Sequence, residues 1–465
     1  LGASCSLLYE YDACTSEEHC DPGLVCRDGS CQPLQPEDVL RAPCEGLIGI
    51  DLSETTDPNT ILIGTVFPET GALDAGIEMN QAVALAVDEI NESGGVNGRR
   101  LGVVTCDSQT DPDVGVEGIR YLVETLQMQA IIGAAISSAT ISGFTDIARP
   151  RGVFMISPAS TSPLITSLPD DGLLWRTVPS DAIQGRAVAR YIVEHGYTRV
   201  AVINRDDAYG RGLRDVTFAT LCELGFPCTS ADAYLTRVYP EQDFAATQQE
   251  IATTLAGFAP EAVVLVSFVD DGLAQLKEIA ATGATSEFIV TDGMNSEKVA
   301  AGITNAEIKC KLVGTKPAAP EGDATNRFRM AYLSKYTGHS SPGVFTENSY
   351  DAAYLVAYAF AAAGAAGEPT GADIAAALRR FSSGDAVEAG PSDWGATLQR
   401  LTDASYTFDF VGASGALDFD ENGDSSANIE MWGIDAVNNT IASRGVILDE
   451  DDVYYPPTLP DCTVP

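Results

Sequence analysis

The 465-residue sequence is poor in basic residues and has no long apolar run. Its 27 Lys and Arg stand against 66 Asp and Glu, which gives a formal net charge of −39. A surface this acidic repels nucleic-acid phosphates and anionic lipid headgroups, so we exclude nucleic-acid binding and attachment to acidic membranes. No apolar stretch reaches the ~18 residues that a membrane-spanning helix needs, and the alanine-rich segment 352–366 predicts a buried helix instead.

The sequence also lacks the motifs of the common enzyme classes. None of its three histidines, His19, His195 and His339, stands beside a recognisable nucleophile. There is no G-x-S-x-G nucleophile motif, no phosphate-binding glycine loop with a lysine, and no indication of a Cys-His pair. We therefore predict no catalytic residues and no cofactor, and an uncharacterised enzyme is kept only as a second alternative.

Cysteines are concentrated at the start of the chain, where apolar residues are few. Six of the eleven lie within the first 44 residues: Cys5, Cys14, Cys20, Cys26, Cys31 and Cys44. A segment that cannot bury a core needs covalent cross-links, so we predict a disulfide-rich module with its linker at residues 1–45. Zinc is the competing interpretation, but the spacings lack the paired Cys-x2-Cys clips of zinc modules, and we predict no metal.

The five later cysteines are less informative. Cys222 and Cys228 bracket the loop ELGFP and are predicted to form a local disulfide, whereas Cys106, Cys310 and Cys462 remain unassigned. Because eleven is an odd number, one thiol is free, lipidated or paired with another chain.

The density of cysteines indicates an oxidising compartment, either the periplasm or the cell surface. The opening LGASC is similar to a lipoprotein processing site, although Gly2 stands where a branched apolar residue is expected. A lipid anchor on Cys5 is therefore an alternative to an ordinary disulfide.

After the module, short apolar strands alternate with amphipathic helices. Strands are predicted at 61–66 and 101–106, and a helix with apolar residues at helical spacing is predicted at 77–91. A second series of the same units begins with the strand 199–204 and continues through 262–267. The fold class is therefore α/β, with two doubly wound parallel-sheet lobes and a crevice between them.

Small hydroxyl residues follow two neighbouring apolar runs, AIIGAA and GVFMIS. Ser137 and Ser138 come after the first run, and Ser160 and Thr161 come after the second. Loops at the carboxyl ends of parallel strands line the binding crevice, and helix amino termini there present unpaired N–H groups. The sequence therefore predicts a site for an anionic group, with a carboxylate as the first candidate.

One segment, LDFDENGD, contains a candidate metal motif. Asp418, Asp420, Asn422 and Asp424 follow the start of a calcium loop, but the twelfth position of that loop is Ile429 instead of glutamate. The same residues fit two strands joined by an Asn-Gly turn. We favour this β-hairpin over a calcium site.

Several segments, in order along the chain, resemble the periplasmic branched-chain amino-acid binding proteins. They are GTVFPETGALDAGIEMNQAVALAVDEINESGGVNGRRL, IIGAAISSAT, FMISPASTSP, LLWRTVPSDAIQG, NRDDAYGRGL and NSYDAAYLVAYAF. The resemblance covers about residues 61–435 and leaves out the first 45. It implies a type I solute-binding protein of an ABC transporter, whose two lobes, joined by a three-strand hinge, close on a ligand by hinge bending.

The resemblance also implies roles within the site. Ser137, the pair Ser160 and Thr161, and the backbone of Ala159 are implied to hold the ligand's α-carboxylate, and Asp292 is implied to receive its ammonium group. Tyr209 is implied to be an aromatic side chain that the second lobe brings over the ligand. The full set of predicted ligand-binding residues is Ser137, Ser138, Ala159, Ser160, Thr161, Tyr209, Phe268 and Asp292.

Other interpretations of these residues stay open. Ser137 or Ser138 alone fits a helix cap, and Asp292 before a glycine fits a turn. Ser160 replaces a common alanine of the family, and Phe268 stands near a position where the family often has tyrosine, so the ligand's side chain is not fixed. The loop FPETGALDAG, with Phe67 and Leu73, is a further candidate for the pocket floor.

We therefore predict an extracytoplasmic solute-binding protein, monomeric and without catalysis, that delivers an amino acid or similar small carboxylate to the permease of an ABC transporter. A ligand-sensing receptor module of the same fold is the first alternative. The predicted domains are the Cys-rich module 1–45, lobe 1 at 59–178 and 318–410, lobe 2 at 179–317 and 411–440, and a tail at 441–465.

Overall fold

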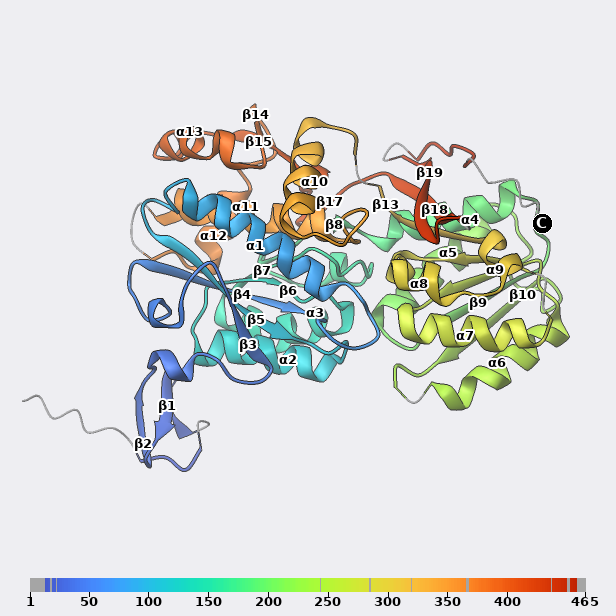
Figure 1. Ribbon diagram of the computed structural model, residues 1–465, viewed down its shortest axis with the longest axis horizontal. Coiled ribbons are helices and arrows are strands. Elements are labelled where there is room, and N and C mark those ends of the chain that lie inside the picture. The colour runs from blue at the N-terminus through green and yellow to red at the C-terminus, as the bar shows by residue number, and fades with distance from the viewer. Residues whose placement is uncertain are drawn as a thin grey trace, which may run out of the picture.

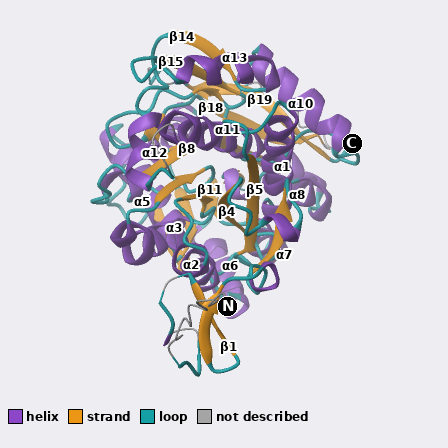
Figure 2. Ribbon diagram, turned by 90° about the vertical axis from the view of Figure 1, so that its left-hand side faces the viewer, coloured by secondary structure: helices purple, strands orange, loops and turns teal. Residues whose placement is uncertain are grey.

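Two seven-stranded sheets organise the part of the chain that the computed structural model describes. That part comprises residues 13–16, 19–21, 23–242, 244–283, 286–318, 320–364, 368–435, 437–449 and 452–457. The two sheets form separate lobes that lie side by side along the long axis, and a small N-terminal module projects from lobe 1 (Figures 1 and 2). This arrangement confirms the predicted fold class.

The sheet of lobe 1 has the strand order β17-β8-β7-β6-β4-β5-β3. Its strands are β3 (Cys44–Ile48), β4 (Thr60–Phe67), β5 (Arg100–Asp107), β6 (Ala130–Gly133), β7 (Phe154–Ser157), β8 (Leu174–Pro179) and β17 (Asp424–Ser425). Strands β4 to β8 are parallel, and β3 adds to the edge in the antiparallel sense. The strands are apolar along nearly their whole length because helices cover both faces.

The helices around lobe 1 are α1 (Gly76–Glu92), α2 (Pro112–Arg120), α3 (Ser137–Gly143), α10 (Asp323–Lys335), α11 (Thr346–Ala363), α12 (Gly371–Leu378) and α13 (Pro391–Leu401). Helices α1 and α11 pack together on one face of the sheet, and α2 and α3 pack on the other (Figure 1). Helix α11 is buried from Thr346 to Ala361, which accounts for its run of alanines. A small sheet beside it consists of β14 (Asp385–Glu388), β15 (Phe408–Gly412) and β16 (Gly415–Ala416).

The sheet of lobe 2 has the order β10-β9-β11-β12-β13-β18-β19. Its strands are β9 (Val200–Arg205), β10 (Tyr234–Tyr239), β11 (Ala262–Val266), β12 (Glu287–Val290), β13 (Leu312–Pro317), β18 (Ile429–Asp435) and β19 (Thr440–Leu448). The first five are parallel, and β18 and β19 join in the antiparallel sense. The helices are α4 (Asp181–Glu194), α5 (Ala208–Glu223), α6 (Ala245–Phe258), α7 (Val269–Ala281), α8 (Glu297–Gly302) and α9 (Ala306–Lys311).

The chain passes between the lobes three times, after β8, after β13 and after β17. The first crossing leads from β8 to α4, the second from β13 to α10, and the third from β17 to β18. Such short parallel connections form the hinge that the family resemblance implies, and they leave the two lobes free to rotate as bodies. No helix among the described residues is both long enough and apolar enough to span a membrane.

The C-terminal part of the sequence folds differently from our expectation. Residues 441–448, which we assigned to a tail, belong to β19 and pair with β18 in the sheet of lobe 2. The pairing places Ile447 and Leu448 in the core, so burial of apolar side chains favours the strand.

The β-hairpin predicted around Asp420 is wrong. The turn forms, and the N–H groups of Asn422 and Asp424 both donate to Asp420 Oδ1. However, β17 pairs in parallel with β8 instead of with the strand before the turn. The cause is Arg176 of β8, which is fully buried and donates to both carboxylate oxygens of Asp424, at 2.7 and 2.6 Å. A buried guanidinium needs such a partner, and this one holds the segment against lobe 1.

Disulfides close the N-terminal module and fasten the chain to lobe 1. Cys14–Cys26 and Cys20–Cys31 enclose the hairpin of β1 (Leu24–Arg27) and β2 (Ser30–Pro33), so these four sulfurs are not available to zinc. Cys44–Cys106 joins β3 to β5, and Cys222–Cys228 is the predicted local bridge. Cys310 is also disulfide-bonded, whereas Cys5 and Cys462 lie outside the described residues.

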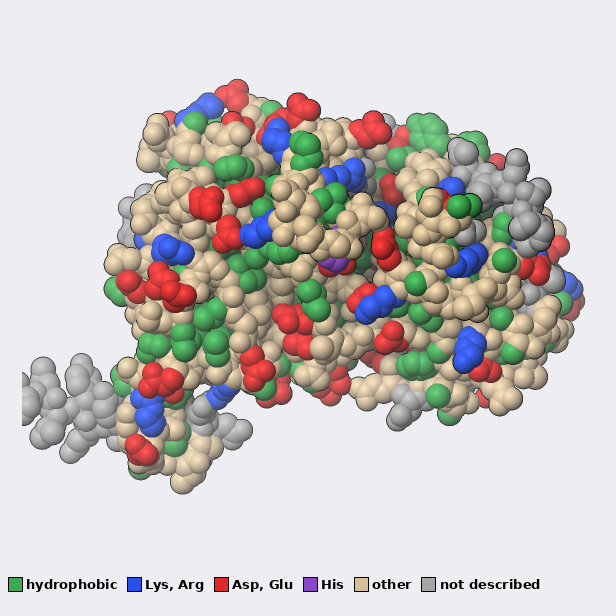
Figure 3. All heavy atoms as spheres, in the orientation of Figure 1, with side chains coloured by type: hydrophobic (Ala, Val, Ile, Leu, Met, Phe, Trp, Pro, Cys, Tyr) green, Lys and Arg blue, Asp and Glu red, His purple; other side chains and the backbone are tan. Residues whose placement is uncertain are grey.

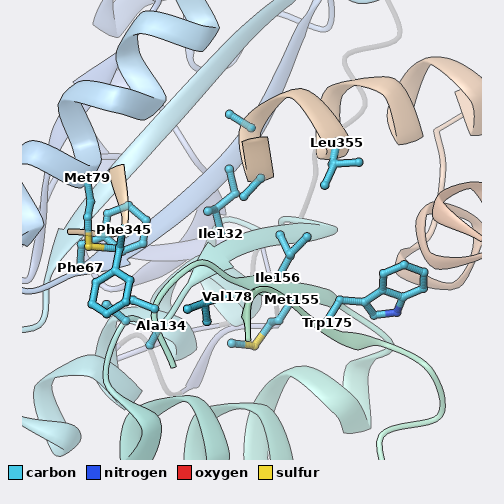
Figure 4. Close-up of a cluster of buried hydrophobic side chains, with 14 of the residues drawn as sticks. Phe67, Met79, Ile132, Ala134, Met155, Ile156, Trp175, Val178, Phe345 and Leu355 are labelled. Carbon is cyan, nitrogen blue, oxygen red and sulfur yellow. The ribbon is translucent and has the colours of Figure 1, made fainter. Parts of the chain in front are cut away.

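The core of lobe 1 fills the space between its sheet and α11. Figure 4 shows Ile132 and Ile156 on neighbouring strands, with Leu355 of α11 above them. Near the carboxyl ends of the strands, Phe67 and Met79 lie beside Phe345, and all of these side chains are buried. The loops that leave this edge of the sheet therefore start from a rigid base.

We expect the Cys44–Cys106 disulfide to stabilise the protein more than Cys222–Cys228 does. The first closes a sequence separation of 62 residues and the second only 6, and a longer closed loop removes more entropy from the unfolded chain. Replacing both cysteines by serine should cost about 4 kcal/mol for the first pair and about 2 kcal/mol for the second. Denaturant unfolding of the two double variants measures the difference, and equal losses would contradict this account.

Candidate functional site

A small cavity lies between the two lobes, at the carboxyl ends of the central strands. Its walls are all buried and consist of Leu73, Ala135, Ile136, Ser137, Ala159, Thr161, Tyr209, Phe268, Asp292, Gly293 and Phe345. Because both lobes contribute walls and none of these residues is exposed, the structure represents the closed form.

Lobe 1 offers neutral hydrogen-bonding groups to this cavity. Helix α3 begins at Ser137, and its N-cap residue Ile136 has no side-chain acceptor, so no side chain caps the first N–H groups of the helix. The Thr161 hydroxyl is buried and has no hydrogen-bond partner among the described residues. Uncapped N–H groups at a helix start carry partial positive charge and favour an anion.

Two of the residues predicted for carboxylate binding, Ser138 and Ser160, do not line the cavity. The Ser160 hydroxyl donates to the carbonyl oxygen of Ala134 at 2.9 Å and lies 2.7 Å from Thr140 Oγ1. It therefore joins the loops after β6 and β7. Ser138 Oγ accepts a hydrogen bond from the N–H of Ala208 at 3.2 Å, which is a contact between the lobes.

Lobe 2 contributes an aromatic pair and a carboxylate. The rings of Tyr209, at the start of α5, and Phe268, just before α7, are stacked with centroids 5.6 Å apart and planes 8° from parallel. The Tyr209 hydroxyl donates to Asp292 Oδ1 at 2.8 Å and lies 2.6 Å from Thr291 Oγ1. Gln184 Nε2 donates to the same oxygen of Asp292 at 2.7 Å. The three predicted residues of this lobe thus come together at the cavity.

Sequence analysis missed Asp181, a second buried carboxylate beside the cavity. It is the first residue of α4, its N–H donates to the carbonyl oxygen of Thr161 at 2.8 Å, and its side chain is fully buried. Neither carboxylate oxygen makes a hydrogen bond of good geometry with the described residues, although the Thr161 hydroxyl is near enough to oppose the rise of the Asp181 pKa. An aspartate at a helix start looks like a cap, but here Ser180 Oγ already caps α4, so only the structure shows that Asp181 is not needed there.

The two carboxylates perturb each other. Burial, followed by the negative charge of Asp292, raises the pKa of Asp181 well above its usual value. Burial also raises the pKa of Asp292, although its hydrogen bonds from Gln184 and Tyr209 oppose the shift. Two buried carboxylates close together favour a cationic group between them, because the cation removes both the desolvation cost and the repulsion.

Apolar side chains complete the cavity wall. Leu73 comes from the loop that we expected to form the floor, whereas Ile136 and Phe345 were not predicted. Phe345 precedes α11, more than 200 positions further along the chain than Ile136, so no local pattern connects the two. With neutral donors, carboxylates and an apolar wall, the cavity complements a small zwitterion that carries an apolar group.

Contacts between the lobes surround the cavity. Asp74 of lobe 1 accepts from Lys298 Nζ at 2.5 Å and from Ser296 Oγ at 3.0 Å, both in lobe 2. On another side, Gln242 Nε2 donates to Asp111 at 2.7 Å. The N–H of Val269 also donates to the carbonyl oxygen of Ala72 at 3.0 Å. These polar contacts join lobe 1 to lobe 2, so they contribute to the stability of the closed form.

Similar proteins are found among both curated sequences and solved structures. An amino acid binding protein of Pseudomonas aeruginosa is 30% identical over 340 residues, which cover 70% of this chain and 84% of that protein. The chemotactic signal transduction system substrate-binding protein BasB of Halobacterium salinarum is 27% identical, covering 77% of this chain and 83% of that protein.

The fold is shared with a solved structure of the branched-chain amino acid transporter substrate binding protein LivJ from Streptococcus pneumoniae, in complex with isoleucine. The two structures have a TM-score of 0.66 at 23% identity, and the match covers 83% of this chain and 99% of the other. Residues 60–415 match the model of the periplasmic binding protein family. This chain belongs to the periplasmic binding protein family.

Proposed function

We propose that this protein is an extracytoplasmic solute-binding protein that captures an α-amino acid with an apolar side chain and delivers it to an ABC transporter. The observation that carries the proposal is the pairing of two kinds of polar group in one closed cavity. Neutral donors of Ser137 and Thr161 line the same cavity as the Asp292 carboxylate, and the buried carboxylate of Asp181 lies close enough to Asp292 for their charges to interact. An α-amino acid needs both kinds of group side by side, because its carboxylate and its ammonium are attached to one carbon.

The carboxylate of the ligand is assigned to lobe 1. The first N–H groups of α3 and the Thr161 hydroxyl have no partner among the described side chains, and the backbone of Ala159 lies in the same wall. Hydrogen bonds from preorganised neutral groups compensate a carboxylate for the water that it loses. Ser138 and Ser160 support this part of the site from behind, through Ala208 and Ala134.

The ammonium group of the ligand is assigned to Asp292 and Asp181. Asp292 already accepts hydrogen bonds from Gln184 and Tyr209, which fix the orientation of its carboxylate. Both carboxylate oxygens of Asp181 are buried without a hydrogen bond of good geometry, and such a group costs free energy unless a donor reaches it. A ligand ammonium provides three N–H donors and one positive charge. It can therefore form hydrogen bonds with both carboxylates and balance their charge, which the neutral side chains of Gln184 and Tyr209 cannot do.

Closure of the lobes is the signal that the protein is loaded. The ligand bridges groups of lobe 1 and lobe 2, so its affinity for the closed form exceeds its affinity for an open form, and binding shifts the population. We further propose that the closed monomer then docks on a membrane permease, and that the ligand is released unchanged. Members of this family bind solutes, which supports a function without catalysis.

A sensory function is the second candidate. The Halobacterium relative is named as the substrate-binding protein of a chemotactic signal transduction system, and it matches most of this chain. The same closure would then be detected by a receptor instead of a permease. Two experiments separate the candidates. Transport of the amino acid in vesicles that contain a permease supports the first, and binding of the loaded protein to a receptor ectodomain supports the second.

Three small molecules with the same branched apolar group test the proposal directly. L-leucine carries both charged groups, 4-methylpentanoate lacks the ammonium, and 3-methylbutylamine lacks the carboxylate. We expect calorimetry to detect tight binding of L-leucine or another apolar α-amino acid, and much weaker binding of the two truncated compounds. Equal affinity for 4-methylpentanoate would contradict the role of the two aspartates, and failure of all twenty amino acids to bind would contradict the proposed function.

Replacing Asp292 by asparagine should weaken the amino acid by at least about 1 kcal/mol, because the variant removes one partner of a desolvated charge pair. The matched control is Asp206→Asn, since Asp206 lies in the same lobe, pairs with Arg211 and is half exposed. Calorimetric titration of both variants measures the effect. An affinity of Asp292→Asn equal to that of the control would remove Asp292 from the site.

Without ligand, closure should depend on pH. Closing the empty lobes buries Asp181 and Asp292 and raises their pKa values, so protonation favours the closed form and this advantage is lost as the pH rises through the raised pKa values. Each unit of pKa difference between the two forms changes their ratio by about tenfold. Small-angle scattering of the ligand-free protein should show a smaller radius of gyration at pH 4 than at pH 7.

The variant Asp181→Asn should shift this equilibrium toward the closed form at neutral pH, because its side chain is neutral at every pH. The liganded wild-type protein serves as the closed reference, and Asp206→Asn serves as the control for a lost surface charge. If the scattering of the ligand-free wild type does not change between pH 7 and pH 4, the two carboxylates do not control closure.

A further inference from the structure

Arg205 is a buried cation next to the aromatic wall of the cavity. It is the last residue of β9, and only 1% of it is exposed. Its guanidinium forms ion pairs with Asp207 at 2.9 Å and with Asp271 at 2.5 Å. Burying a guanidinium costs several kcal/mol unless its partners are well placed, so these two carboxylates hold Arg205 in one position.

Both partners of Arg205 also hold the backbone that carries the aromatic pair. Asp207 is the N-cap of α5, and its other oxygen accepts from the N–H of Gly210 at 2.6 Å, one residue after Tyr209. Asp271 accepts from the N–H of Phe268 at 3.0 Å. One guanidinium therefore links the start of α5 to the loop before α7.

The guanidinium also contacts the aromatic wall itself. Its central carbon lies 4.2 Å from the centroid of the Phe268 ring, which is within the range of a cation–π interaction. Phe268 is stacked on Tyr209, and the Tyr209 hydroxyl donates to Asp292. A continuous set of contacts thus runs from Arg205 through the two rings to the carboxylate proposed for the ligand's ammonium.

We propose that Arg205 is a positioning residue of the ligand site, which fixes the Phe268 ring against Tyr209 without lining the cavity. This inference rests on the proposed function, because it assigns Arg205 an effect on ligand affinity. A buried ion pair that served stability alone would act on unfolding and not on affinity. Arg205 is linked to the segment that carries Tyr209 and to the segment that carries Phe268, and this favours a role in positioning the two rings.

A double-mutant cycle tests the proposal. Arg205→Lys keeps a positive charge between Asp207 and Asp271 but removes the planar face that covers Phe268, and Phe268→Leu removes the ring. We expect Arg205→Lys to weaken an amino acid such as L-isoleucine by about 2- to 30-fold, which corresponds to the range of cation–π energies. In the Phe268→Leu background, the same replacement should change the dissociation constant less than about twofold. Equal weakening in both backgrounds overturns the proposal.

The control variant is Tyr239→Phe. The Tyr239 hydroxyl donates to Asp271 at 2.7 Å, on the same oxygen that Arg205 contacts, and its ring is not part of the stack. We expect this variant to lower the melting temperature and to leave the affinity unchanged. If it weakens amino-acid binding as much as Arg205→Lys does, the effect on affinity comes from the hydrogen bonds to Asp271 and not from the contact of Arg205 with Phe268, and the proposal is wrong.

The failures of the two proposals are distinguishable. If the wild-type protein binds no amino acid, the proposed function fails, and the role of Arg205 fails with it. If the wild type binds but the cycle shows no coupling, only the role of Arg205 fails. Should Arg205→Lys not fold, the NMR signal of the Arg205 Nε–H in 15N-labelled protein decides, because the Phe268 ring should shift it upfield relative to Phe268→Leu. If the Arg205 Nε–H signal has the same chemical shift in both proteins, the guanidinium does not lie over the Phe268 ring and the proposal is wrong.

Discussion

Two carboxylates, Asp181 and Asp292, become buried where the two lobes meet, and this burial is the constraint on which the closed structure depends. Like charges in a desolvated cavity repel each other, so the empty closed form must take up protons or accept a cation. A ligand with an ammonium group removes that cost, whereas an uncharged solute does not. The same constraint explains why closure can report the presence of a ligand. The closed form is high in free energy when the cavity is empty, and a bound ligand lowers that free energy.

The remaining architecture keeps the other half of the site rigid while the lobes move. In lobe 1, the hydroxyl of Ser160 joins the loops after β6 and β7, and Arg176 donates at 3.3 and 3.0 Å to the carbonyl oxygens of Ser160 and Ser162. Asp424 in turn balances the charge of Arg176, although it comes from a segment at the last crossing between the lobes. The loops that we propose to bind the ligand's carboxylate are therefore fixed by contacts within lobe 1, and only three short connections need to bend.

Periodicity was enough to predict the alternating strands and helices, because these depend on short segments, and the family resemblance implied the convergence of Tyr209, Phe268 and Asp292. The rest depends on contacts between distant segments. Nothing near Asp181 shows that its carboxylate lacks a partner, and nothing near Ser160 shows that its hydroxyl turns toward Ala134. The hairpin around Asp420 failed for the same reason, since its decisive partner, Arg176, precedes it by more than 200 positions. Local sequence thus predicts which loops meet, and tertiary packing decides which atoms face the ligand.

The high negative charge and the site serve different purposes. Acidic side chains are spread over both lobes on the face shown in Figure 3, instead of gathering around one opening. A zwitterionic amino acid has no net charge, so the field of a protein with net charge −39 neither attracts nor repels it at long range. A basic amino acid would be attracted, but its side-chain charge would meet the apolar wall of Leu73, Ile136 and Phe345 and lose its hydration there. Under the proposed function, selection among amino acids rests on this apolar wall, and the surface charge contributes to solubility.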